Sequence, residues 1–305
     1  MIEVRVPATS ANMGAGFDTM GIALNLYNTI QVRETESGLK IVNLNCREYL
    51  PKNENNLIYR AIMRVFDEVG YQKKGLAITQ NSKIPVTRGL GSSSACIVGG
   101  LLAGNVLSGR KLTYPDILNL AAEMEGHPDN VAPALYGGFC VSARVGDKAI
   151  CQSVKLSPKF RYAVMVPDFF VPTKKSRGLL PETVSLGDAS HNISRAVLFA
   201  LGLAQGNTEF LKIGVDDRLH QPYREQEVEG LSEIFKKSYE LGAKASFLSG
   251  SGPTVLSVLD GNYREFCGGM RDFFREQETA WSCRILQVDN VGAVVKTVGG
   301  FRKDD

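Results

Sequence analysis

Histidine and clustered basic charge are both scarce in this chain of 305 residues. There are three histidines and no cluster of Cys and His side chains, so a structural zinc site is not expected. Lys and Arg together number 35 against 32 Asp and Glu, and no Lys/Arg run is longer than two residues. This balance argues against an electrostatic nucleic-acid binder, and we expect no nucleic-acid partner.

Long hydrophobic runs are also missing. No uninterrupted apolar stretch approaches the roughly 18 residues of a membrane span. The first ten residues lack the basic-then-apolar pattern of a signal peptide. The six cysteines are widely spaced and form no CxxC pair, which is typical of reduced, mostly buried thiols. Together these absences predict a cytoplasmic protein with no membrane partner.

Hydrophobic periodicity predicts strands and helices in mixed order, without a strict βαβ repeat, which indicates an α+β fold. The expected strands are 2–6, 29–36, 39–45, 76–80, 139–145, 148–154, 162–166, 245–248, 254–259, 284–288 and 293–298. The expected helices are 56–69, about 94–107, 114–125, 192–203, 208–215, 227–241 and 263–277. A boundary near residues 153–160 divides the chain into two expected domains, 1–155 and 156–305, with a frayed tail at 301–305.

The strongest motif is PVTRGLGSSSA, which runs from Pro85 to Ala95 into an apolar helix. Free backbone N–H groups at such a helix start suit an anion such as phosphate. The segment is neither a Walker A loop, since the G-K-[ST] ending is absent, nor a dinucleotide fingerprint. The alternative explanation is a flexible turn with a serine N-cap.

Two further loops are built from small residues. Residues 7–18, PATSANMGAGFD, follow the first strand, where Asn12 and Asp18 could line a small polar pocket or belong to a surface Ω-loop. Residues 250–253, GSGP, lie between two apolar strands, and a tight hairpin explains them adequately. They become interesting only as a second loop that lets a polyphosphate approach closely.

A polar turn follows the helix expected at 114–125. Glu125 projects into the apolar arc of this helix and Glu123 lies on the opposite side. Glu123 is therefore expected to be a solvated surface charge. Glu125 needs a metal, a basic side chain or hydrogen-bond donors as a partner. Three more polar side chains follow within five residues: His127, Asp129 and Asn130.

Cations gather in the second half of the chain, at residues 173–177 and 217–224. Most such residues are solvated surface charges, and the local sequence does not separate Arg177 and Arg224 from the others. A Ser/His/Asp hydrolase is not expected, because no G-x-S-x-G elbow occurs.

These motifs, in this order, resemble the GHMP family of small-molecule kinases. The segment 85–95 matches the family's P-x-x-x-G-L-G-S-S-x-A motif almost residue for residue. The resemblance spans residues 2–298, and these segments resemble the members that act on homoserine: 7–18, 125–133, 177–181, 220–224 and 248–253. It implies a two-domain GHMP kinase fold, with an N-terminal domain like the second domain of ribosomal protein S5 and a ferredoxin-like C-terminal domain. ATP and substrate would meet between them.

The resemblance also implies ATP-dependent phosphorylation of the side-chain hydroxyl of L-homoserine in threonine biosynthesis, with Mg²⁺ as cofactor and the option of a homodimer. By similarity, the nucleotide would be held by Asn56, Pro85, Gly89, Leu90, Gly91, Ser92, Ser93 and Ser94. Glu125 and Ser93 would bind Mg²⁺. Homoserine would be surrounded by Asn12, Asp18, His127, Asp129, Arg177, Arg224, Gly250, Ser251 and Gly252. The implied catalytic residues are Asp18, Asn12 and Glu125.

Three other functions fit parts of this pattern. A mevalonate-type kinase of the same fold would be expected to carry a lysine near its N-terminus, whereas the first lysine here is Lys40. A sensor that only binds ATP could lose Glu125, which this chain keeps. A nucleic-acid binder of the S5 type conflicts with the balanced charge. In some relatives an insert separates the glutamate from the His-x-Asp-Asn turn, but here only Gly126 does so.

Overall fold

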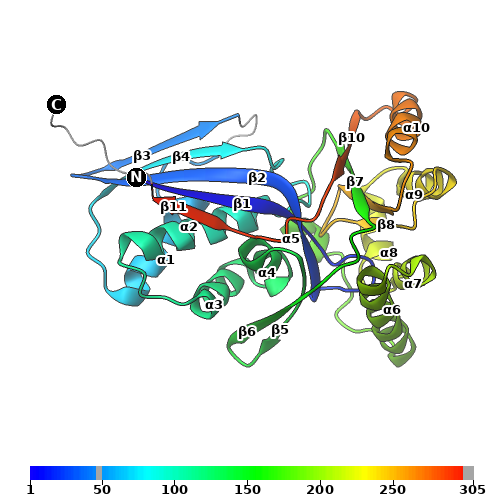
Figure 1. Cartoon of the computed structure of the whole chain (residues 1–305), viewed down its shortest axis with the longest axis horizontal. Coiled ribbons are helices and arrows are strands. Elements are labelled where there is room, and N and C mark those ends of the chain that lie inside the picture. The colour runs from blue at the N-terminus through cyan, green and yellow to red at the C-terminus, as the bar shows by residue number, and fades with distance from the viewer. Residues whose placement is uncertain (46–49, 298–305) are drawn as a thin grey trace.

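The computed structural model describes residues 1–45 and 50–297. One of its two sheets is built from β1 (Ile2–Ala11), β2 (Met20–Thr35), β3 (Leu39–Leu44), β4 (Gly75–Ser82), β5 (Phe139–Val145), β6 (Lys148–Val154) and β11 (Val294–Thr297). Its order is β11-β1-β2-β4-β3, and the β5–β6 hairpin extends from β2. Helices lie along one face of this sheet (Figure 1): α1 (Leu57–Val69), α2 (Ser92–Leu107), α3 (Tyr114–Glu125) and α4 (Pro128–Tyr136). The helix α2 lies between the sheet and α1 and is buried along most of its length, which agrees with its apolar sequence.

The second sheet is antiparallel and has the order β10-β7-β9-β8. Its strands are β7 (Arg161–Pro167), β8 (Ala245–Leu248), β9 (Val255–Leu259) and β10 (Trp281–Leu286). Its helical elements are α5 (Thr173–Arg177), α6 (Leu186–Gln205), α7 (Thr208–Gly214), α8 (Gln221–Arg224), η1 (Glu225–Glu227), α9 (Leu231–Glu240) and α10 (Tyr263–Arg275). Helices separate β7 from β8 and β9 from β10. This is the β-α-β-β-α-β order of a ferredoxin-like unit, as expected.

The last strand corrects the expected domain division. β11 pairs antiparallel with β1, with Ile2 opposite Thr297 and Val4 opposite Val295. It therefore belongs to the first sheet, although it lies within 156–305. The physical reason is the edge of β1, whose backbone N–H and C=O groups gain partners from β11. For the rest of the chain the division after residue 155 stays a prediction.

Several elements are longer than expected or were missed. β1 runs through 7–11, which was expected to be a loop, because these small residues pair with the start of β2 across a bulge at Pro7/Ala8. The polar turn after Glu125 opens α4, in which Pro128 takes the first helical position. α6 begins at Leu186 rather than residue 192, because Ser185 caps its first turn. Residues 225–227 form η1, so α9 starts four residues later than expected.

A continuous hydrophobic core joins the two sheets. It contains residues of β1 and β2 together with Tyr162 of β7, Phe199 of α6 and Phe247 of β8. A smaller cluster, which includes Leu231, Phe266 and Met270, lies between the second sheet and the helices α9 and α10. The two halves thus pack directly against each other through a shared core.

Two expectations about chemistry can be compared with the described residues. None of the five cysteines in these ranges forms a disulfide, and three of them are buried. Cys46, Val298 and the tail 301–305 lie outside the described residues. No helix in the described part of the chain is long and apolar enough to cross a membrane.

Candidate active site

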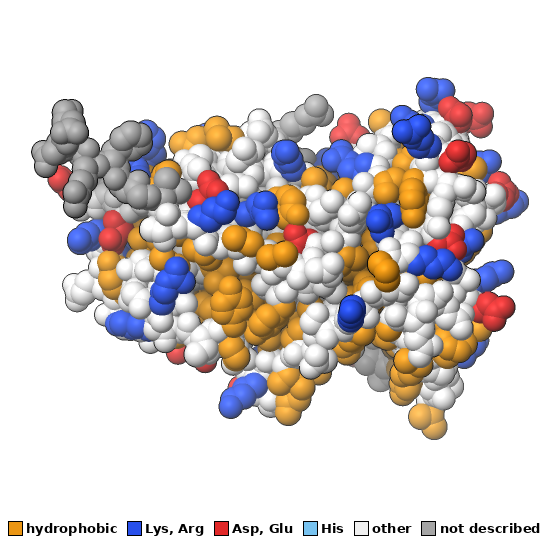
Figure 2. All heavy atoms as spheres, viewed as in Figure 1, with side chains coloured by type: hydrophobic (Ala, Val, Ile, Leu, Met, Phe, Trp, Pro, Cys, Tyr) orange, Lys and Arg blue, Asp and Glu red, His pale blue; other side chains and the backbone are white. Residues whose placement is uncertain are grey.

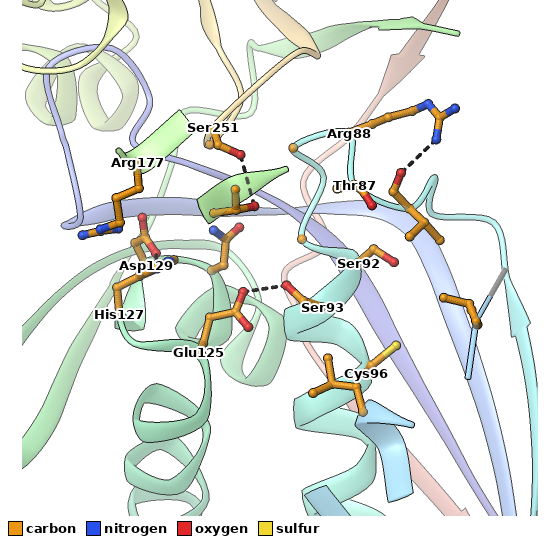
Figure 3. Close-up of a pocket in the computed structure, with 18 of the residues that line it drawn as sticks. Thr87, Arg88, Ser92, Ser93, Cys96, Glu125, His127, Asp129, Arg177 and Ser251 are labelled. Carbon is orange, nitrogen blue, oxygen red and sulfur yellow. Dashed lines mark hydrogen bonds and ion pairs between the residues drawn. The ribbon is translucent and has the colours of Figure 1, made fainter. Parts of the chain in front are cut away.

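A cavity of about 260 Å³ lies between the two halves of the chain. Its wall is built from the β1–β2 loop, the start of α1, the loop before α2, the α3–α4 junction, α5, α8 and the β8–β9 loop. Figure 3 shows side chains from these distant segments turned toward one another. The fold therefore gathers the separate sequence motifs at one place.

The loop before α2 requires glycine at two positions. Gly89 and Gly91 have φ angles of 76° and 65°, in the left-handed region. A Cβ at Gly91 would lie 1.9 Å from the Thr9 hydroxyl oxygen, and one at Gly89 would lie 2.2 Å from the Ser249 carbonyl oxygen. Gly91 is the N-cap of α2 and makes no side-chain cap, so the serine-cap explanation is wrong. Gly91, Ser92 and Ser93 line the cavity, so the start of α2, whose first backbone N–H groups have no partner within the helix, belongs to its wall.

The same loop is fastened to three other segments. Thr9 N donates to the Leu90 carbonyl oxygen over 3.2 Å, and Thr254 N donates to the Arg88 carbonyl oxygen over 3.4 Å. Arg88 turns away from Glu125 and Ser93 (Figure 3) and donates to the carbonyl oxygens of Val86 and Pro167 over 2.8 and 3.2 Å. The loop is thereby held to β1, to the residue that precedes β9 and to the end of β7.

Glu125 has the hydrogen-bond donors that its inward position requires. Its Oε1 accepts from Ser93 Oγ over 2.6 Å (Figure 3) and from Ser94 Oγ over 2.9 Å. Glu123 is exposed and its carboxylate lies 3.1 Å from the guanidinium of Arg64. The helical-face prediction is confirmed for both residues. The carboxylate and hydroxyl oxygens of Glu125 and Ser93 are the donor type that Mg²⁺ prefers, so these residues fit this ion.

The α3–α4 junction brings three polar residues into the cavity. Gly126 ends α3 with a φ of 98° and His127 is the N-cap of α4. His127 Nδ1 hydrogen-bonds to the buried carboxylate of Asp129. Burial lowers the pKa of His127, but the hydrogen bond and charge of Asp129 act in the opposite direction and leave it raised. Asn130 Oδ1 accepts from Thr9 Oγ1 over 2.7 Å.

Arg224 is buried, with 2% of its surface exposed, so the surface-charge interpretation is wrong for this residue. Its Nη1 donates to the Gly250 carbonyl oxygen over 2.9 Å and lies 3.3 Å from His220 Nδ1. Its Nε is buried and has no hydrogen-bond partner among the described residues. Burial lowers the pKa of Arg224 to about 10, so the guanidinium stays charged at neutral pH. A buried guanidinium with an unpartnered donor has the chemistry that suits a planar anion such as a carboxylate.

The loop that contains Asn12 and Asp18 is a wall of the cavity and not a surface Ω-loop. Asn12 is buried, accepts from Asp18 N over 3.0 Å and donates to the Gly250 carbonyl oxygen over 2.8 Å. The Asp18 carboxylate forms a two-pronged ion pair with Arg177, in which Nη1 and Oδ1 are 3.3 Å apart. Arg177 and Arg224 both lie over the Phe17 ring, at 5.5 and 5.6 Å from its centroid.

Not every residue suggested by the resemblance lines this cavity. Ser92 and Ser251 do, but Pro85, Leu90, Ser94 and Gly252 do not. Pro85 and Leu90 line a second cavity instead. Leu90 is also part of the hydrophobic core. Asn56 lines the cavity while its Oδ1 caps α1, accepting from the N–H groups of Ile58 and Tyr59 over 3.0 and 3.3 Å.

Four residues that the sequence did not single out support the site: Thr9, Phe17, Ser249 and His220. The Ser249 hydroxyl lies 2.5 Å from the Gly89 carbonyl oxygen and 2.8 Å from Ser10 Oγ. Two signals pointed toward them: each lies within four positions of a candidate residue, and each belongs to one of the segments 7–18, 220–224 and 248–253 that carry the family resemblance.

Comparisons with known proteins agree with this geometry. The model for the GHMP kinases N terminal domain matches residues 56–138, and that for GHMP kinases C terminal matches residues 200–266. A homoserine kinase from Caldicellulosiruptor bescii is 46% identical over 301 residues, which cover 98% of both chains. One from Clostridium beijerinckii is 44% identical and covers 97% of this chain and 98% of its own.

A solved structure gives the same result. The crystal structure of a homoserine kinase from Cytophaga hutchinsonii is 29% identical, covers 97% of both chains and superposes with a TM-score of 0.87. The full-length match, the paired family domains and the phosphate loop agree with one another. The chain therefore belongs to the GHMP kinase family, in its homoserine kinase branch.

Proposed function

We propose that this chain transfers a phosphoryl group from ATP to the side-chain hydroxyl of L-homoserine, in the cytoplasm, as a step of threonine biosynthesis. The observation that carries this proposal is Arg224, a buried guanidinium whose Nε has no partner among the described residues, in the same cavity as the loop before α2. A kinase for a simple alcohol has no need of such a group. A kinase for a hydroxy acid or an amino acid does, because its substrate carries a carboxylate apart from the reacting hydroxyl. The buried carboxylate of Asp129, which suits an ammonium, favours the amino acid.

The charges around the cavity match those of a zwitterionic amino acid. A guanidinium binds a carboxylate through two parallel hydrogen bonds, so we assign the substrate carboxylate to Arg224. Ligand atoms of Asp18, His127 and Asp129 lie within 4.8 Å of one another. We assign the substrate ammonium to the carboxylate of Asp129, which leaves Asp18 for the hydroxyl. Arg177 is already engaged by Asp18 and would complete the carboxylate site from the other side.

We assign the triphosphate to residues 89–94, where the N–H groups at the start of α2 offer donors. Glu125 and Ser93 would hold Mg²⁺, which neutralises charge on the phosphate oxygens when it is bound. The hydrogen bonds of Glu125 to Ser93 and Ser94 keep its carboxylate in place for this role.

Phosphoryl transfer passes through a loose transition state, so positioning contributes more than a strong base. We assign the orientation of the substrate hydroxyl to Asp18. Its carboxylate is held by Arg177 and its backbone N–H by Asn12, while Asn12 is itself fixed to the Gly250 carbonyl oxygen. The β8–β9 loop, which contains Gly250 and Ser251, supports this arrangement as a scaffold.

The test is ADP release by the purified protein with ATP, Mg²⁺ and five alcohols: L-homoserine, L-serine, L-threonine, mevalonate and galactose. We expect the highest kcat/KM for homoserine, by roughly 10-fold or more over serine. The side chain of serine is one methylene shorter, so its hydroxyl would not reach the γ-phosphate. Faster turnover of mevalonate or galactose, or no turnover of any alcohol, would overturn the proposal.

We also propose that two copies of the chain associate through α6. The solvent side of this helix is apolar, with 86, 67, 55 and 41% of the residue exposed at Leu186, Ile193, Val197 and Leu201. Hydrophobic side chains reach the surface there (Figure 2), where a solvated helix normally carries charge. An antiparallel pair would place Ile193 against Val197 of the second copy. Ile193→Glu should then convert a dimer to a monomer in sedimentation velocity; a wild-type monomer would exclude it.

A further inference from the structure

His220 lies directly behind Arg224 and outside the cavity wall. It is fully buried, with Nδ1 at 3.3 Å from Arg224 Nη1 and Nε2 at 2.7 Å from the Gly14 carbonyl oxygen. The Phe17 ring stacks on the imidazole with centroids 5.4 Å apart. Both Gly14 and Phe17 belong to the loop that also carries Asp18. His220 therefore connects that loop to the arginine on α8.

The partners of His220 determine which of its nitrogens carries the proton. A guanidinium can only donate hydrogen bonds, so Nδ1 must accept from Arg224. The proton of a neutral imidazole then sits on Nε2, where it is donated to the Gly14 carbonyl oxygen. In a charged imidazolium the Nδ1–H group would point at the Nη1–H donor of Arg224. It would also place a second positive charge beside the guanidinium.

We infer that neutral His220 is a positioning residue, whose Nδ1 lone pair holds the Arg224 guanidinium in place for the substrate carboxylate. This inference rests on the proposed function only in the identity of that carboxylate. The observation behind it is the set of contacts of Arg224. Its Nη1 is shared between His220 and the Gly250 carbonyl oxygen, and its Nε has no partner among the described residues.

Three charged groups face His220. Asp217 Oδ2 lies 3.4 Å from Nε2 and Arg224 lies at Nδ1. The negative charge of Asp18, on the β1–β2 loop, favours the protonated imidazole. Burial lowers the pKa of His220; the charge of Asp217 opposes this and that of Arg224 adds to it, and the net direction is downward. His220 is therefore neutral at physiological pH. It gains a proton only below the ordinary histidine value of about 6.5, and homoserine binding should weaken as it does so.

Two variants separate positioning from mere packing. His220→Asn keeps an acceptor near the position of Nδ1 but does not titrate. His220→Gln carries its amide near the position of Nε2, so it can still donate to the Gly14 carbonyl oxygen but offers Arg224 nothing. We expect His220→Gln to raise the homoserine KM about 10-fold with little change in the ATP KM. His220→Asn should stay near the wild-type KM and lose the rise in KM that the wild type shows in acid.

The protonation state can be observed without any substrate. In protein labelled with ¹⁵N-histidine, the shifts of the three imidazoles report their tautomers, and the signal absent from His220→Gln is that of His220. We expect the Nε2–H tautomer and no charged form at pH 7. An Nδ1–H or charged His220, or an equal homoserine KM in wild type and His220→Gln, would overturn the inference. If instead the wild type did not phosphorylate homoserine but the tautomer were as expected, the proposed function would fail and the arginine–histidine contact would stand.

Discussion

At the scale of single residues, Gly91 of the loop before α2 is a position where a side chain does not fit. Its φ is 65° and a Cβ would lie 1.9 Å from Thr9 Oγ1, which itself donates a hydrogen bond to Asn130 Oδ1. We expect Gly91→Ala to weaken ATP binding by at least about 10-fold, because the loop must move to relieve the contact. Titration calorimetry with a non-hydrolysable ATP analogue measures the loss.

The matched control is Gly268→Ala on α10, where a Cβ would meet no atom within 4 Å. That variant should bind the nucleotide as the wild type does. A folded Gly91→Ala protein with unchanged affinity, judged folded by its circular dichroism, would show that this loop does not hold the triphosphate.

Glu125 and Glu123 lie two residues apart on α3 and differ in their surroundings. Glu125 accepts hydrogen bonds from two serine hydroxyls at the cavity, whereas Glu123 forms an exposed ion pair with Arg64. We expect Glu125→Gln to lower kcat by roughly 100-fold or more and to raise the Mg²⁺ concentration needed for half-maximal rate. Glu123→Gln should change neither, since an exposed ion pair contributes about 0–1 kcal/mol. Equal effects of the two substitutions on kcat would exclude Glu125 as the metal ligand.

At the scale of elements, the start of α1 illustrates how one residue serves both a helix and a wall. Asn56 Oδ1 accepts from the N–H groups of Ile58 and Tyr59, and its Nδ2 donates to the Pro51 carbonyl oxygen over 2.8 Å. We expect Asn56→Ala to lower the free energy of unfolding by about 1 kcal/mol through loss of the cap. Denaturant unfolding measures this, with the exposed Asn55→Ala as control. An unaltered stability combined with a large rise in ATP KM would instead give Asn56 a direct role at the nucleotide.

Local chemistry explains what the sequence could predict about these elements. The face of α3 that carries Glu125 follows from helical spacing alone. The left-handed φ angles of Gly89 and Gly91 in the loop before α2 are also a local requirement. The hairpin of β5 and β6 was predicted to the residue because its turn, Gly146-Asp147, is a local signal.

Long-range contacts decided what the sequence could not predict. Nothing near Arg224 indicates burial, which arises because α8 packs against the loops carrying Phe17 and Gly250. The polar turn after Glu125 looked like a loop because two prolines are rare within one short helix, yet Pro128 starts α4 and Pro133 lies inside it. The return of β11 to the first sheet depends on the open edge of β1, which lies at the opposite end of the chain, with Ile2 paired to Thr297.

At the scale of the whole molecule, the shared core predicts cooperative unfolding. Hydrophobic residues of both sheets belong to one cluster. The single tryptophan, Trp281 on β10, stacks on Phe274 with ring centroids 5.1 Å apart and reports on the second sheet alone. We expect its fluorescence and the far-ultraviolet circular dichroism to give the same denaturation midpoint. An earlier fluorescence transition would mean that the second sheet unfolds independently.

At the scale of the cleft, the proposed phosphate loop of one half lies in the same cavity as Arg224 of the other half. The most direct test of this account compares two enzymes on two substrates. Wild type and Arg224→Lys are each assayed with L-homoserine and with 3-aminopropan-1-ol, which lacks the carboxylate. The substitution should reduce kcat/KM for homoserine about 10- to 150-fold, the loss of one charge-assisted pair of roughly 1.5–3 kcal/mol. It should leave the slow reaction of 3-aminopropan-1-ol and the ATP KM nearly unchanged. Equal losses for the two alcohols would contradict the assignment of Arg224 to the substrate carboxylate.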